Sequence, residues 1–449
     1  MTDENVDNSS SRVYSIVFAS YLYSLTNEIA IYWTSPVLAK LRYIQPGNPL
    51  DKKLSTSEQE WLGSLICLGY MAGLIPYSYL CSRYGRKYTL LSLGFIHLIA
   101  FGLYTTSSLS LYYVGRFLSG IASSVGFVVF PMYISEICKD TDRGKLLVSR
   151  QIFAGCGTVI AYVAGNYLSM LWFNILICVF PLLFLISFGL LAVESPYFYV
   201  TNERYDNAKE VYIELTSPTN GEEPADEEIQ EMKRAVEMTD GESLGALLSQ
   251  KHIQKSIIIV LALFIFQQLT GYMAYATYTE LIVESKHATV IIGMVVLIGS
   301  SLSTMFVDKF GRKLHLLVSA SGVVLANIAL AVYFTYFKAD YYTPIICISA
   351  FFLSYNLGFA FIPQILCAEI LPQKIKFGVG AVAGVLGWGV AFLITNFFLE
   401  MNNIYLIVVF CICPAIQLAI IYFYVPETKG QSFRMIQGML QFDISPESE

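Results

Sequence analysis

The chain has 449 residues, of which 55% are apolar and only 14% are charged. Soluble domains carry about 25% charged residues, so this fraction is too small to cover the surface of a soluble protein. The net charge of −6 belongs to one segment, because residues 194–255 hold 14 acidic and 6 basic residues and the rest of the chain is +2. This distribution argues against a nucleic-acid partner, which requires a concentrated basic face.

Apolar stretches long enough to cross a bilayer recur along the chain. A helix needs about 20 predominantly apolar residues to span the hydrocarbon core. Twelve stretches bounded by charged or turn residues meet this requirement: residues 14–38, 61–81, 88–107, 109–134, 146–168, 170–193, 256–281, 289–307, 314–337, 344–368, 377–399 and 404–425. The sequence therefore predicts an all-α membrane protein with twelve transmembrane helices.

The basic residues predict the orientation of these spans. With twelve spans both termini face one side of the membrane, and 21 of the 28 Lys and Arg residues fall on that side, against six on the other and Arg116 within a span. The positive-inside rule then places both termini in the cytoplasm. The predicted domains are a cytoplasmic N-terminus (1–13), a six-helix bundle (14–193), a cytoplasmic linker with short helices (194–255), a second six-helix bundle (256–425) and a cytoplasmic tail (426–449).

The two predicted bundles repeat the same short motifs in the same order. The sequence RYGRK at 83–87 follows the second span, and KFGRK at 309–313 follows the eighth. An acid seven residues before a base follows both the fourth and the tenth span, and Glu194 and Glu427 close the sixth and the twelfth. Parallel repeats of six helices are typical of transporters that hold substrate between two rocking halves.

These motifs suggest a cytoplasmic latch made of ion pairs. Glycine permits a tight turn between helices, and the neighbouring cations can pair with carboxylates at helix ends. Such pairs would hold one conformation and break in the other, as alternating access requires. The alternative is that the basic residues only anchor the topology. The predicted latch comprises Arg83, Arg86, Glu136, Arg143, Glu194, Asp308, Arg312, Glu369, Lys376 and Glu427.

Further motifs resemble the sugar porter family of the major facilitator superfamily over nearly the whole chain. They include Gly115-Arg116 with Gly120, Pro131-x-Tyr133-Ile-Ser-Glu136, Glu194-Ser-Pro196, Gln267-Gln268-Leu-Thr-Gly271 and Pro426-Glu427-Thr-Lys-Gly430. The start of the chain, with Trp33-Thr-Ser-Pro36, looks like the insect branch that facilitates trehalose transport. The resemblance implies the major facilitator fold, a location in the plasma membrane, and transport of a hexose or trehalose by facilitated diffusion.

The resemblance also implies a substrate site. Its members here are Gln151, Gln267, Gln268, Tyr278, Asn356, Gln364 and Trp388. The chemistry agrees, because a neutral polyol is best bound by amide and hydroxyl groups together with an aromatic face. Packing offers an alternative for these residues, since glutamine also forms hydrogen bonds between membrane helices and tryptophan also packs against lipid.

Several positions that are polar in the family are apolar in this chain, namely Met273, Val296 and Ala391. The lost hydrogen bonds imply altered affinity, an altered substrate or the loss of transport. Glu28 is a carboxylate in the middle of the first span, where an acid is costly and usually functional. It lies near the acid that binds the proton in proton-coupled sugar porters, although a neutral, hydrogen-bonded structural role is the alternative.

Three hypotheses follow: a facilitative sugar transporter, a proton symporter that uses Glu28, and a sugar sensor that has lost transport. An enzyme is not expected, because the four histidines and nine cysteines lack metal-ligand spacing and the chain has no phosphate-binding glycine loop. Neither a metal nor a cofactor is expected. The expected partners are a small sugar and the lipid bilayer, whereas the sequence does not predict an oligomeric state.

Overall fold

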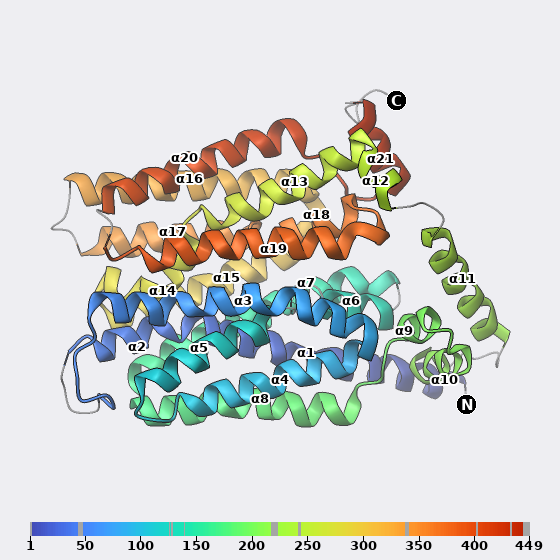
Figure 1. Ribbon diagram of the computed structural model, residues 1–449, viewed down its shortest axis with the longest axis horizontal. Helices are drawn as coiled ribbons and strands as arrows, with labels where there is room; N and C mark the ends of the chain where they lie inside the picture. Colours follow the sequence, from blue (N-terminus) through green and yellow to red (C-terminus); the bar gives the residue numbers. More distant parts are fainter. Residues whose placement is uncertain are drawn as a thin grey trace.

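The computed structural model describes residues 2–43, 48–124, 126, 129–138, 140–216, 223–240, 244–336, 341–400, 403–431 and 433–442. Within these ranges the regular structure is helical throughout, and two groups of helices lie side by side (Figure 1). The first group, coloured blue to green, is the N-terminal half and comprises α1 (Thr2–Tyr32), α2 (Thr34–Leu41), α3 (Thr56–Tyr84), α4 (Arg86–Leu103), α5 (Leu109–Ser124), α6 (Val129–Ile137), α7 (Asp140–Tyr167) and α8 (Met170–Leu191).

The second group, coloured yellow to red, is the C-terminal half (Figure 1). It comprises α13 (Lys251–Gln268), α14 (Tyr272–Val283), α15 (Lys286–Phe310), α16 (Arg312–Tyr336), α17 (Tyr342–Leu357), α18 (Ile362–Ile370), α19 (Gln373–Asn396), α20 (Asn403–Tyr424) and α21 (Phe433–Phe442). The connecting segment forms α9 (Pro196–Thr201), α10 (Tyr205–Thr216), α11 (Glu223–Asp240) and α12 (Leu244–Ser249). The start of α1, helices α9–α12 and α21 lie at one end of the molecule, here called the terminal end, and the opposite end is called the far end.

The twelve expected spans correspond to single helices or to pairs of helices. Spans one, four, seven and ten are each divided in two, as α1–α2, α5–α6, α13–α14 and α17–α18. Gly271 has a φ of 90° at the third of these breaks, a left-handed conformation that glycine adopts without strain. Broken membrane helices expose backbone groups, which are tolerated where they face protein or a cavity.

Ten helices in the described part of the chain are long and apolar enough to cross a membrane. The two other expected spans correspond to α1 and α4. Helix α1 begins with a polar segment, and α4 is 18 residues long and starts with Arg86 and Lys87. The outer surfaces of the spanning helices carry exposed apolar side chains, for example Leu190 at 82% and Leu325 at 68% exposed. Side chains of this kind are stable in contact with lipid.

In the described part of the chain the two halves contact one another chiefly through α3 with α19, α7 with α15, and α2 with α14, and α1 also contacts α14. Within each half the packing is local, for example α3 with α5 and α16 with α17. Glycines allow the closest approaches, because a Cβ at Gly120 would lie 2.1 Å from the carbonyl oxygen of Ile66. One apolar core continues from the N-terminal half into the C-terminal half, and a second core lies within the N-terminal half and reaches α10.

Candidate functional site

A cavity of about 700 Å³ lies between the two halves. Its lining includes α1 and α7 of the N-terminal half and α13, α17, α18 and α19 of the C-terminal half. It extends to the terminal end, where Glu136, Tyr197, Arg312 and Glu369 line it. The cavity is therefore reached from the end at which the linker helices lie (Figure 1).

The structure places six of the seven predicted substrate residues on the wall of this cavity: Gln151, Gln267, Gln268, Asn356, Gln364 and Trp388. They come from α7, α13, α17, α18 and α19, so both halves contribute. The sequence separates these residues by up to 237 positions (388 − 151), and the fold brings them to one chamber. Tyr278 is the exception, because it is fully buried and does not line the cavity.

The glutamines differ in how their amides are satisfied. The Gln267 side chain donates a hydrogen bond of 2.5 Å to the carbonyl of Phe359, in the break between α17 and α18. The Gln268 Oε1 is buried and has no hydrogen-bond partner among the described residues. An unpaired buried amide oxygen costs on the order of 1–3 kcal/mol, so this acceptor favours a ligand or water that donates to it.

Aromatic side chains form one wall of the chamber. The Trp388 ring stacks on Tyr70 at 3.7 Å between ring centroids, and this contact joins the two halves. Tyr272 stacks on Tyr355 at 4.1 Å, and both rings line the cavity. One face of Trp388 is thus covered by protein, and these rings supply the apolar surface against which the carbon face of a sugar ring packs.

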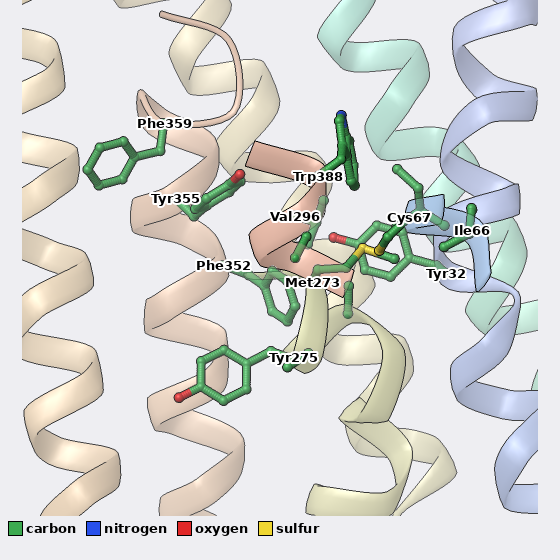
Figure 2. Close-up of a cluster of buried hydrophobic side chains, with 14 of the residues drawn as sticks. Tyr32, Ile66, Cys67, Met273, Tyr275, Val296, Phe352, Tyr355, Phe359 and Trp388 are labelled. Atoms are coloured by element: carbon green, nitrogen blue, oxygen red, sulfur yellow. The ribbon is translucent and has the colours of Figure 1, made fainter. Parts of the chain in front are cut away.

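An apolar cluster closes the chamber toward the far end. Figure 2 shows Tyr32 and Cys67 of the N-terminal half directed toward Met273 and Val296 of the C-terminal half. Val296 lines the cavity, whereas Met273 is 1% exposed and does not. Two of the positions that are polar in the family therefore contribute apolar surface here, one to the cavity wall and one to the cluster behind it.

Hydrogen bonds from α3 to the end of α19 and to the residues that follow it hold the far end closed. The Glu60 Oε1 accepts the backbone N–H groups of Leu399 and Glu400, each at 2.9 Å. The Ser64 hydroxyl donates to the Asn396 side chain at 2.9 Å. Both contacts join the halves, and the Glu60 side chain is only 2% exposed. Sequence reasoning missed Glu60, because an acid at the edge of an apolar span looks like ordinary interfacial charge.

Further contacts at the far end are made by α14. The Ser35 hydroxyl accepts the N–H of Glu280 at 3.0 Å, and Tyr162 donates to the Thr279 hydroxyl at 3.1 Å. The Tyr278 hydroxyl donates to the carbonyl of Thr395 at 2.9 Å, and its ring stacks on Phe398. Tyr278 therefore belongs to the closed far end rather than to the wall of the cavity.

At the terminal end the described latch residues include an ion pair in each half. Arg86 pairs with Glu136 at 2.9 Å, and Arg312 pairs with Glu369 at 3.4 Å. The first pair is the more buried, with side chains 7% and 10% exposed against 18% and 28% in the second. Each pair joins helices of the same half, and both are formed while the cavity reaches this end.

Glu194 and Glu427 act as acceptors for backbone groups. The Glu194 carboxylate accepts the N–H groups of Arg86 at 2.8 Å and Lys87 at 3.1 Å, at the start of α4. Glu427 accepts the N–H groups of Arg312 at 2.9 Å and Lys313 at 3.0 Å, at the start of α16. Burial raises the pKa of Glu194, and these hydrogen bonds oppose that rise. The repeated acids therefore satisfy the free N–H groups of a helix N-terminus.

Of the other described latch residues, Arg83 contacts tyrosine side chains, and the charge of Lys376 acts on Glu369 of the second pair. The Arg83 guanidinium contacts the hydroxyl of Tyr79 at 3.2 Å and lies over the ring of Tyr84. Lys376 lines the terminal part of the cavity. The side chains of Arg143 and Asp308 lie outside the described residues.

Glu28 lines the cavity, together with a residue that sequence reasoning had counted with the basic connecting segments. This residue is Arg150, which lies within α7 directly before Gln151 and faces the chamber. The charges of Glu28 and Arg150 act on one another. Its position next to Gln151 could have predicted that Arg150 lies at the chamber. Because the start of this span was uncertain, Arg150 was grouped with the cytoplasmic basic residues instead.

Two helical halves, a cavity lined from both sides and an apolar exterior define a multi-pass membrane transporter of the major facilitator type. The family model described as sugar (and other) transporter matches residues 2–440. The chain belongs to this family.

Among curated relatives, the facilitated trehalose transporter of Bombyx mori is 28% identical over 86% of this chain and 80% of that protein. The mouse solute carrier family 2, facilitated glucose transporter member 8, is 29% identical over 95% of this chain and 94% of that protein. The trehalose transporter of Aedes aegypti is 28% identical, and the matched part spans 52% of its length. These matches agree with the resemblance noted from the motifs.

Solved structures show the same fold. The proton:xylose symporter XylE bound to 6-bromo-6-deoxy-D-glucose superposes with a TM-score of 0.78, at 20% identity, over 96% of this chain and 99% of that one. The inward open conformation of the E. coli xylose transporter superposes with a TM-score of 0.77, at 20% identity, over 95% and 99% of the two chains. At this identity the likeness describes the architecture alone.

Proposed function

We propose that this protein moves a neutral sugar, a hexose or trehalose, across the plasma membrane by facilitated diffusion through alternating access. The observation that carries the proposal is the convergence of Gln151, Gln267 and Gln268 with Trp388 on one chamber between the halves. Amides and an aromatic face suit a polyol, and the substrates named for the curated relatives are trehalose and glucose.

In this proposal the chain crosses the membrane twelve times and both termini lie in the cytoplasm. The domains are those expected from the sequence, with bundles at 14–193 and 256–425 around the linker 194–255. The terminal end then faces the cytoplasm, and the structure is an inward-facing state. The outward-facing state requires the contacts of Glu60, Ser64 and Tyr162 to break while the terminal end closes.

The test is counterflow of labelled glucose, fructose, trehalose and an inositol into vesicles that hold the purified protein and unlabelled sugar. Transient accumulation of at least one of these sugars is expected, because exchange through an alternating-access carrier needs no external energy. Binding of a sugar without any flux would instead favour a sensor, the role suggested by the apolar residues Met273, Val296 and Ala391. Absence of both binding and flux would contradict the proposal.

Proton-coupled transport is the second candidate, favoured by one observation. The Glu28 carboxylate lines the cavity and has no hydrogen-bond partner among the described residues. A symporter would accumulate sugar when a proton gradient is applied, and both an uncoupler and Glu28→Gln would abolish that accumulation. Facilitated diffusion predicts equilibration that is indifferent to the gradient.

A further inference from the structure

Glu28 of α1 and Arg150 of α7 face the same chamber from neighbouring helices. Gly157 brings these helices together, because a Cβ at this position would lie 2.4 Å from the carbonyl oxygen of Leu25 and 3.1 Å from the Cβ of Glu28. Arg150 lies seven residues before Gly157, which is about two helical turns, so both lie on the same face of α7. The close helix contact therefore sets the carboxylate and the guanidinium on one wall.

Within the described residues, the polar atoms of these two side chains form no hydrogen bond. Their charges act on one another, but within the described residues they form neither a direct ion pair nor a hydrogen bond to other protein groups. The Arg150 guanidinium rests over the ring of Phe130, 5.5 Å from its centroid. Both side chains are only partly buried and reach the cavity. Their open donors and acceptors therefore face the space that a substrate occupies.

Arg116 is a buried arginine with a structural role, and its guanidinium is stabilised by hydrogen bonds to backbone carbonyl groups. It is fully buried in α5, and it donates to the carbonyl oxygens of Ala30 at 2.5 Å, Leu62 at 3.1 Å and Gly63 at 3.5 Å. Among the described residues no comparable set of carbonyls contacts Arg150, although a charge within a membrane protein is costly without partners. The contrast indicates that the hydrogen-bonding capacity of Arg150 is kept for a group that enters the cavity.

The opposite wall explains why such a group is needed. Val296 and Gly387 line the cavity on the C-terminal half, and neither side chain offers a hydrogen bond. Ala391 is buried one turn beyond Gly387 on α19. The polar side chains that this half places on the cavity wall include Gln267, Gln268, Asn356 and Gln364, whereas the N-terminal half adds the charged side chains of Glu28 and Arg150 to Gln151.

We propose that Glu28 and Arg150 form a subsite for two adjacent hydroxyl groups of the transported sugar, an inference that rests on the proposed function. The carboxylate accepts a hydrogen bond from one hydroxyl, and the guanidinium donates to the other. Because the pair is neutral overall, it favours an uncharged polyol over an anion or a cation.

The test measures counterflow KM and maximal rate for the best sugar substrate and for its monodeoxy analogues. The variants are Glu28→Gln, Glu28→Leu and Arg150→Met, with Lys145→Met as a control on the exposed start of the same helix. For the intact sugar, KM is expected to rise about tenfold or more in Glu28→Leu and Arg150→Met, the value of a hydrogen bond to a charged group. The maximal rate should change far less.

The deoxy analogues separate a binding role from a structural one. If the subsite exists, Glu28→Leu should not raise KM for the one analogue that lacks the hydroxyl bound by Glu28. Likewise, Arg150→Met should not raise KM for the analogue that lacks the hydroxyl bound by Arg150. Equal losses for every analogue, or unchanged KM in all variants, would overturn the subsite. Glu28→Gln keeps the shape of the side chain, and thermal unfolding of each variant checks that it folds.

Two further results would also overturn the subsite, each in a recognisable way. Counterflow of a zwitterionic amino acid in preference to sugars would mean that the pair binds separated charges. Loss of gradient-driven accumulation in Glu28→Gln with unchanged sugar KM would assign the carboxylate to proton coupling. If the wild-type protein neither binds nor exchanges any sugar, the proposed function itself is contradicted. If the wild-type protein exchanges sugar and the variants have the same KM as the wild type, only the subsite is contradicted.

Discussion

The Glu60 carboxylate of the N-terminal half accepts a hydrogen bond of 2.9 Å from the backbone N–H of Leu399 in the C-terminal half. The same oxygen accepts the N–H of Glu400, so one buried acid holds two backbone groups across the interface. These bonds lie at the far end, which is the end that has to open for the cavity to change sides. Glu60 is thus placed to set the balance between the two states.

We expect Glu60→Ala to shift this balance toward the state open at the far end. Two hydrogen bonds to a charged group are lost, and a shift on the order of 1–3 kcal/mol corresponds to roughly a five- to hundredfold change in the populations. The measurement is the labelling rate of Thr395→Cys, a buried position behind the closure, by a maleimide that does not cross the membrane. The rate is expected to rise in Glu60→Ala.

Glu58→Ala is the matched control. Glu58 is an acid in the same helix, and it contacts Lys52 at 2.7 Å and Ser55 at 2.9 Å within its own half. Its removal should leave labelling of Thr395→Cys unchanged. If labelling becomes faster to the same extent in both variants, the negative charge at this end controls opening and the hydrogen bonds between the halves do not.

Gly311→Ala is expected to destabilise the C-terminal half. Gly311 has a φ of 83° and a ψ of 167°, a region occupied essentially by glycine, and a Cβ there would lie 2.5 Å from the Glu427 carboxylate. The backbone strain alone costs about 1–3 kcal/mol, and the displaced carboxylate would release the N–H groups at the start of α16. Thermal unfolding in detergent should show a lower midpoint.

Gly378→Ala is the corresponding control in the helix α19. No heavy atom lies within 4 Å of a Cβ at this position, and alanine in a helix interior is favoured over glycine by about 0.5–1 kcal/mol. Its unfolding midpoint should be unchanged or slightly raised. A Gly311→Ala protein as stable as the control would contradict the role assigned to Glu427.

Arg86→Met is expected to destabilise the N-terminal half more than the loss of an exposed ion pair does. Removing one partner of a buried pair costs about 3–5 kcal/mol, since Glu136 would remain charged and unpaired. The double variant Arg86→Met with Glu136→Leu should recover much of the stability that Arg86→Met loses. Lys209→Met breaks the exposed pair with Asp226 in the linker helices, and its effect should stay below about 1 kcal/mol.

Urea unfolding in detergent micelles, monitored by circular dichroism, would compare these three variants. If the double variant is no more stable than Arg86→Met, the charge of Glu136 is not the cause of the loss. If Lys209→Met lowers the free energy of unfolding as much as Arg86→Met does, burial of the Arg86–Glu136 pair does not increase its contribution to stability.

Much of this fold follows from the sequence because its signals are long or repeated. Blocks of about 20 apolar residues predict spanning helices, and the glycines of the two RYGRK-like motifs reappear with positive φ at equivalent turns, at 95° for Gly85 and 83° for Gly311. The family resemblance implies that the glutamines of spans five and seven bind substrate, while the cost of an unpaired amide in an apolar span requires only a partner in a ligand or in a neighbouring helix. The structure places all three on the wall of the chamber.

Other features depend on backbone groups and on exact helix boundaries. The sequence predicts ion pairs for Glu194 and Glu427, whereas the structure shows them accepting backbone N–H groups, which residue types do not reveal. Arg150 was counted with a connecting segment because the start of its span was uncertain by a few residues. Tyr278 was assigned to the substrate from its motif, and the break between α13 and α14 carries it into the far-end closure.

The most direct test of transport through this cavity compares Gln267→Ala with Gln254→Ala in sugar counterflow. Gln267 lines the chamber, and Gln254 is an exposed glutamine on the same helix at the terminal end. Wild type and Gln254→Ala are expected to exchange sugar equally, while Gln267→Ala should show a KM raised by about tenfold or exchange that is no longer measurable. Exchange by Gln267→Ala with the KM and rate of the wild type would contradict sugar transport through this chamber.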